Sequence, residues 1–133
     1  MRRLLPFALL ALMLAGCGGG KVAGPFPKTV IGTVAKAPSG AAAGKALFAQ
    51  NGCGGCHTFK PAGAAGKVGP DLDNLAADAK KANRGSVEAY AKESIENPDA
   101  YVVPGFSKGV MPAFAGKLTD SQIADLVAFL TKS

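Results

Sequence analysis

The clearest hydrophobic pattern in the chain lies near its C-terminus, where apolar residues recur at the spacing of one helix face. The positions of this stripe, spaced i, i+3, i+4 and i+7, are Ile123, Leu126, Val127 and Leu130. Thr119 stands before the stripe as a capping residue, and Gln122 occupies the third helical position of a capping box. The pattern predicts a final helix that begins after Thr119 and buries its apolar face.

Three earlier segments have the composition or the capping residues of helices. They are about Ala41–Asn51, which is rich in alanine, about Leu72–Lys81, with Asp71 at its start, and a segment from Ser86 to Asn97. Ser86 can cap the last of these, and Pro98 disfavours helical geometry at the residue before it. No window alternates polar and apolar residues well enough to predict a strand. The pattern therefore predicts an all-α domain.

The N-terminal segment has the features of an export signal. Two arginines precede an apolar run over residues 4–15, which is about 18 Å long as a helix and too short for a hydrocarbon core of about 30 Å. The run ends in Leu14-Ala15-Gly16-Cys17, which resembles the lipobox of bacterial lipoproteins. This resemblance implies a lipoprotein signal peptide over residues 1–16 and a lipid on Cys17. The alternative is ordinary cleavage that leaves Cys17 as a free thiol.

Residues 17–39 are rich in Gly and Pro, and we expect them to form a tether between the lipid and a domain at residues 40–133. The 133-residue chain has a net charge of +6. Of its 15 Lys and Arg residues, five precede residue 40, where there is no Asp or Glu. The domain itself is therefore nearly neutral. It lacks the clustered basic face of a nucleic-acid-binding protein.

One short motif carries the chemistry of the chain: Cys53-Gly54-Gly55-Cys56-His57, a C-x-x-C-H sequence. Two thiols at this spacing can add to the two vinyl groups of one haem, and the adjacent imidazole then lies under the iron. The motif predicts one haem c bound covalently through both cysteines, with His57 as the proximal axial ligand.

Three other interpretations of this motif stay open at this point. Asp71 or Asp73 could complete a zinc site, although such a site normally needs four ligands and the chain has one His. A thiol redox pair would sit in a βαβ context, which the pattern does not show. A structural disulfide between Cys53 and Cys56 would leave His57 without a role.

A haem that transfers electrons needs a second axial ligand, commonly Met. Met111 is the only methionine after the leader, because Met1 and Met13 lie within it. The segment around it, residues 98–116, is rich in Gly and Pro, and Pro112 holds the Met111 backbone extended. We therefore predict that Met111 is the distal axial ligand. The alternative is that Met111 fills a gap in the core.

Residues 40–133 resemble class I cytochrome c. The segments that carry the resemblance are, in order, Gly44 with Phe48, the C-x-x-C-H motif, Gly69-Pro70-Asp71-Leu72, Val110-Met111-Pro112-Ala113-Phe114 and Asp125-Leu126-Val127-Ala128-Phe129-Leu130. The resemblance implies an all-α fold of four or five helices around one covalently bound haem c. It implies that the Pro70 carbonyl accepts a hydrogen bond from His57 Nδ1–H, which fixes the tautomer. It also implies that Gly44 lets the first helix approach the last, with Phe48 and Phe129 at the crossing.

The chain departs from the family in having no Trp to bond a haem propionate. Tyr101, Ser107 and Arg84 are candidates for this role. Lys60 and Lys67 follow the motif and are candidates to flank the exposed haem edge. The alternative interpretation is that Lys60 and Lys67 are ordinary solvated lysines.

Together these features predict an electron-transfer protein and not an enzyme. We expect a monomer that is lipid-anchored on the extracytoplasmic, periplasmic face of a bacterial membrane. It would pass electrons between redox partner proteins of a respiratory chain, from a quinol-oxidising complex to a terminal oxidase or reductase. The run from Ile95 to Pro112 further resembles cytochrome c domains attached to respiratory oxidases. Two alternatives stay open: a haem-based sensor or peroxidase-like enzyme with an open sixth site, and a fixed subunit of an oxidase complex.

Overall fold

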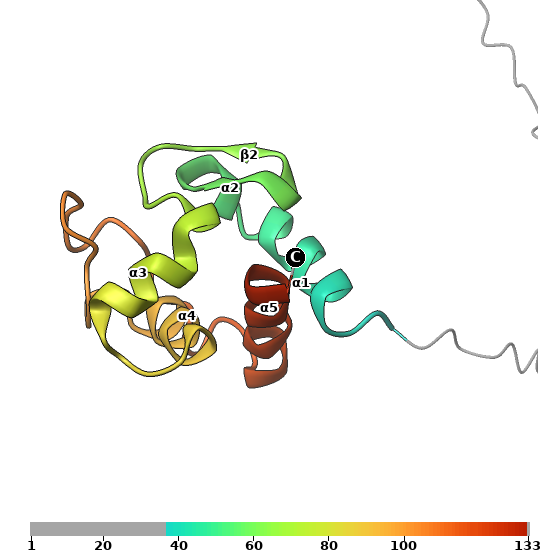
Figure 1. The fold of residues 1–133 in the computed structure, drawn as a ribbon. Helices are drawn as coiled ribbons and strands as arrows, with labels where there is room; N and C mark the ends of the chain where they lie inside the picture. Colours follow the sequence, from blue (N-terminus) through green and yellow to red (C-terminus); the bar gives the residue numbers. More distant parts are fainter. Residues whose placement is uncertain (1–36, 133) are drawn as a thin grey trace, which may run out of the picture. The chain divides into compact units, whose positions relative to one another are not determined.

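The computed structural model describes residues 37–132, so the predicted signal peptide, Cys17 and nearly all of the tether lie outside the described residues. Within this range the chain forms five α-helices, two short 3₁₀ helices and one small sheet (Figure 1). In chain order the elements are α1 (Ala41–Gln50), α2 (Cys53–Cys56), β1 (Thr58–Phe59), η1 (Lys60–Ala62), β2 (Ala64–Ala65), η2 (Leu72–Asn74), α3 (Leu75–Ala82), α4 (Val87–Glu96) and α5 (Asp120–Lys132). The mostly helical architecture confirms the expected fold class.

The helix starts agree with the capping residues in the sequence. Ser86 precedes α4, and its hydroxyl accepts a hydrogen bond from the Ala89 backbone N–H at 3.2 Å. Before α5, the Gln122 N–H donates to the Thr119 hydroxyl at 3.3 Å, and the Thr119 N–H donates to the Gln122 side-chain oxygen at 2.9 Å. This reciprocal pair is the capping box that the sequence predicts.

Two local elements differ from the expectation. The helix expected at about Leu72–Lys81 begins instead as a 3₁₀ turn, in which the Asp71 carboxylate accepts a hydrogen bond from the Asp73 N–H at 3.0 Å. The α-helix proper starts only at Leu75. The antiparallel pair of β1 and β2 was not expected. Each strand has two residues, which is too short for an alternating pattern to be visible in the sequence.

The first and last helices of the described chain pack directly against each other, and Figure 1 shows α1 beside α5. Gly44 makes this approach possible, because a Cβ built there would lie 2.0 Å from the Asp125 backbone oxygen and 2.7 Å from Phe129 Cβ. Phe48 and Phe129 meet edge to face, with ring centroids 5.8 Å apart. The predicted crossing of these two helices is confirmed.

Two clusters of buried side chains form the core. The larger joins α1, β1, α4 and α5 and consists of Phe48, Phe59, Ile95, Ile123, Leu126 and Phe129. The smaller joins α3 and α4 and consists of Leu75, Ala79, Tyr90 and Ala91. Members of both clusters line the same cavity, which lies between the helices and the long segment that follows α4. No helix within residues 37–132 is long and apolar enough to cross a membrane.

Candidate functional site

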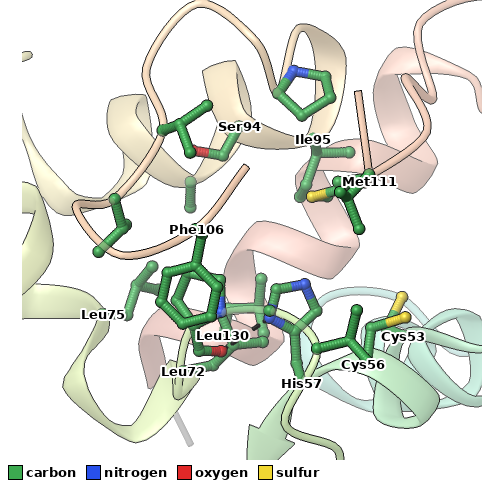
Figure 2. A pocket seen from close by; sticks show the side chains of 18 of the residues that line it. Cys53, Cys56, His57, Leu72, Leu75, Ser94, Ile95, Phe106, Met111 and Leu130 are labelled. Atoms are coloured by element: carbon green, nitrogen blue, oxygen red, sulfur yellow. Dashed lines mark hydrogen bonds between the residues drawn. The ribbon is translucent and has the colours of Figure 1, made fainter. Parts of the chain in front are cut away.

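α2 presents both cysteines of the C-x-x-C-H motif on the wall of this cavity (Figure 2). Gly52 precedes the helix with φ of 69°, a left-handed conformation that favours glycine. Cys53 is half-buried, Cys56 is exposed, and no disulfide joins them. Burial raises the pKa of the Cys53 thiol, whereas a reactive redox cysteine has a lowered pKa. The raised pKa of Cys53 disfavours the redox-pair interpretation.

His57 follows α2 in an extended conformation, and it is 9% exposed. Its Nδ1–H donates to the Pro70 carbonyl oxygen at 2.8 Å, which is the contact that the sequence resemblance implies. Because Nδ1 carries the proton, Nε2 keeps its lone pair and is the nitrogen able to bind a metal.

The backbone before Pro70 is clamped against the motif. The Gly69 N–H donates to the Cys56 carbonyl oxygen at 2.8 Å. A Cβ built on Gly69 would lie 2.5 Å from His57 Cε1, so a side chain at position 69 would displace the imidazole ring. Sequence alone marks Gly69 as part of a turn, and its contact with the ring emerges only in the folded chain.

Met111 lies across the cavity from His57, on the long segment between α4 and α5 (Figure 2). Its side chain is half-buried, and the segment that carries it contains no helix or strand. The Phe114 N–H donates to the Ile95 carbonyl oxygen of α4 at 3.0 Å, which anchors the chain shortly after Met111. The structure thus brings Met111, His57 and both cysteines to one cavity.

The cavity has a volume of about 250 Å³ and mostly apolar walls. Large aliphatic and aromatic side chains from five elements make up much of its lining: Phe48, Leu72, Leu75, Ile95, Leu126 and Leu130. Besides the motif residues, its titratable groups are three carboxyls and two phenols: Asp71, Asp78, Asp99, Tyr90 and Tyr101. No Lys or Arg of the described chain lines it. Such a lining suits a flat, largely apolar cofactor.

The three candidate partners of a haem propionate are placed differently. Tyr101 and Ser107 line the cavity, and Tyr101 packs edge to face on Tyr90 with ring centroids 6.0 Å apart. Burial raises the pKa of Tyr90, so its hydroxyl stays neutral. Arg84 is absent from the lining, and its guanidinium pairs with the Glu93 carboxylate of α4. Of the three candidates, the structure therefore brings only Tyr101 and Ser107 to the cavity.

The remaining candidates lie outside the cavity or lack partners for a metal. Lys60 and Lys67 are both exposed, and neither contributes to the lining. Asp73 accepts a hydrogen bond from the Lys60 N–H at 3.0 Å, and its other oxygen lies 3.8 Å from the Lys60 ammonium. Residues 37–132 hold no group of three His, Cys, Asp or Glu side chains that could bind a metal ion, so the zinc alternative with Asp71 or Asp73 has no site.

The donor set of the cavity fits a covalently held haem. Attachment needs two thiols beside an apolar pocket and an imidazole next to them. Cys53, Cys56 and His57 meet that requirement, and the Pro70 contact already selects the metal-binding nitrogen of the ring.

Comparison with known proteins leads to the same family. Residues 41–133 match the cytochrome c family. The chain is 40% identical over 90 residues to cytochrome c6 of Picosynechococcus sp., a match that covers 68% of this chain and 70% of the relative. It is 31% identical over 127 residues to a cytochrome c homolog of Bradyrhizobium diazoefficiens, which covers 85% of this chain and 62% of that protein. With its helical fold, and with Cys53 and Cys56 in place for attachment, the chain belongs to the cytochrome c family, as a class I electron carrier that binds one haem c covalently.

Proposed function

We propose that this cytochrome is a one-electron carrier of a bacterial respiratory chain, with His57 and Met111 as the two axial ligands of its iron. The observation that carries the proposal is that these two side chains, from distant parts of the sequence, face one apolar cavity beside the motif cysteines (Figure 2). Met111 is also the only methionine between residue 14 and the end of the chain. No other thioether of that region competes for the role.

The haem supplies an iron that gains or loses one electron. The residues of the chain keep both axial groups in place during that change. The Pro70 carbonyl orients His57 through Nδ1–H, which leaves Nε2 as the nitrogen that would bind the iron. The Met111 thioether is neutral and soft, and it favours reduced iron relative to a second imidazole. Because both ligands come from anchored segments, little has to reorganise when the charge of the iron changes.

Absorption spectroscopy of the matured protein tests this ligand pair. We expect a haem with two thioether links in a pyridine haemochrome assay and a sulfur-to-iron band in the oxidised form. Met111→Ala should lose that band and keep the covalent haem. Lys108→Ala removes an exposed side chain of the same segment and should keep the band. An oxidised wild-type protein without the band would contradict the proposal and favour an open-site sensor or enzyme. A band that survives in Met111→Ala would show that Met111 is not the sulfur ligand and would also contradict the proposal.

We also propose that a lipid on Cys17 tethers the carrier to the extracytoplasmic, periplasmic face of the membrane. The lipobox residues and the Gly/Pro-rich stretch that follows them support this proposal. A tether raises the effective concentration of the carrier near membrane partners, which we propose to be a quinol-oxidising complex and a terminal oxidase or reductase. Cys17→Ser should release the protein from membranes. Tight membrane association of this variant would disprove the anchor, and co-purification with an oxidase at high salt would favour a fixed subunit over a mobile carrier.

A further inference from the structure

The segment between α4 and α5 carries Met111 but has little regular structure to hold it. Between residues 98 and 114, three backbone N–H groups donate to backbone oxygens: Ala100 to Asn97, Phe106 to Val103, and Phe114 to Ile95. The first two close local turns. Only the third reaches a helix, and it lies after Met111. The stretch before Met111 therefore depends on side-chain contacts for its position.

One such contact spans this stretch. The Asp99 carboxylate accepts a hydrogen bond from the Gly109 backbone N–H at 2.8 Å. It is the one side-chain hydrogen bond found between residues 98 and 113 of the described chain. Asp99 stands just after α4, and Gly109 precedes Met111 by two residues. The bond thus links the residues just before Met111 to the end of α4. On the other side of Met111, the Phe114 N–H is bonded to the Ile95 carbonyl of the same helix.

The conformation of Gly109 suits this contact. Its φ is 74°, in the left-handed region that glycine adopts without strain. A turn of this kind directs the N–H of Gly109 toward the side-chain oxygen of Asp99. Both Asp99 and Met111 also line the cavity, so the acceptor of this exposed bond belongs to the site itself.

We propose that Asp99 is a positioning residue for Met111, in that its bond to Gly109 holds the segment in the conformation that presents the thioether to the cavity. This proposal rests on the proposed function, in which Met111 binds the iron. If the segment is free to move, only a fraction of the molecules have Met111 in place, and the apparent affinity of the thioether falls by that fraction. An external ligand then competes more easily for the same position.

Imidazole titration of the oxidised, full-length, haem-loaded protein measures this competition. We expect Asp99→Ala to bind imidazole about fivefold more tightly than wild type, which corresponds to about 1 kcal/mol. Asp99→Asn keeps an acceptor oxygen at the same reach and should bind imidazole within twofold of wild type. Asp73→Ala is the matched control, because Asp73 also accepts a backbone N–H from a distant residue, Lys60, away from Met111. It should leave the imidazole affinity unchanged.

The outcomes separate this proposal from the one on which it rests. If wild type lacks the sulfur-to-iron band, the ligand assignment fails first. If wild type has the band and Asp99→Ala binds imidazole with wild-type affinity, the ligand assignment stands and the role of Asp99 is refuted. If Asp99→Asn behaves like Asp99→Ala, the charge matters and the hydrogen bond does not, which also refutes the proposal. Equal effects of Asp99→Ala and Asp73→Ala would indicate general loss of stability and would refute it as well.

Discussion

Gly44→Ala is the substitution for which the structure and helix propensity predict opposite results. In an isolated helix, replacing Gly by Ala stabilises by about 1 kcal/mol. Here the new Cβ would lie 2.0 Å from the Asp125 backbone oxygen and 2.7 Å from both the Asp125 carbonyl carbon and Phe129 Cβ. These are atoms of backbone and of a buried side chain, so none can swing aside. Only a displacement of α5 can relieve the clash.

The size of that displacement sets the expected cost. Ordinary contact begins near 3.4 Å, so the shortest distance must grow by about 1.4 Å. Such a shift would separate Phe48 from Phe129, which now pack edge to face. Overpacking of this kind costs about 3 kcal/mol at the upper end of its usual range. After the gain in helix propensity, we expect a net loss of about 2 kcal/mol, or a fall in Tm of about 10 °C for a domain of this size.

Denaturant unfolding of the haem-loaded protein, followed by helical circular dichroism, measures this loss. Ala46→Gly is the matched control, because Ala46 is an exposed position of the same helix. It should cost about 1 kcal/mol through propensity alone. If Gly44→Ala is as stable as wild type, or more stable, the close approach of α1 and α5 at this glycine is refuted.

Two further predictions concern the site and the ion pair near it. Gly69→Ala should displace the His57 ring, because the added Cβ would lie 2.5 Å from Cε1. We expect NMR to show faster exchange of the His57 Nδ1 proton with water. An unchanged exchange rate would contradict the contact between Gly69 and the ring. Hydrogen bonding to Arg84 lowers the pKa of Glu93 in the folded protein. The ion pair therefore contributes its full stability at pH values above the unfolded-chain pKa of about 4.3. This stability is lost as the pH falls through the lower pKa of the folded state. Glu93→Gln should therefore be less stable than wild type at pH 7, and the difference should vanish in acid; a difference that stays constant in urea unfolding across this pH range would disprove the linkage.

The sequence predicts well those features that depend on neighbouring residues. Ser86 and Thr119 mark helix starts because their hydroxyls bond N–H groups three residues ahead. The C-x-x-C-H spacing and the single methionine after residue 13 predict the candidate haem-binding residues from residue type and position alone. The partner of each capping hydroxyl lies within one helical turn, and the haem-binding residues are predicted from the chemistry of one cofactor.

Other features depend on partners that local pattern does not encode. α2 has two glycines among its four residues, which disfavour a helix by propensity. The His57 N–H, just after the helix, donates a hydrogen bond to the carbonyl oxygen of Cys53, its first residue. The positive charge of Arg84 makes it a candidate partner of a haem propionate in the sequence. In the folded chain its guanidinium pairs with the Glu93 carboxylate instead.

The pairing of α1 with α5 also has a consequence for the order in which the protein can mature. Ribosomes make the chain from its N-terminus, so α5 is synthesised after all the other helices of residues 37–132. Until it emerges, Phe48 lacks its contact with Phe129, and the cavity lacks the wall provided by Leu126 and Leu130. The thiols of Cys53 and Cys56 precede that helix by more than half of the domain. They therefore stay reachable throughout the interval before the final helix arrives and closes the site.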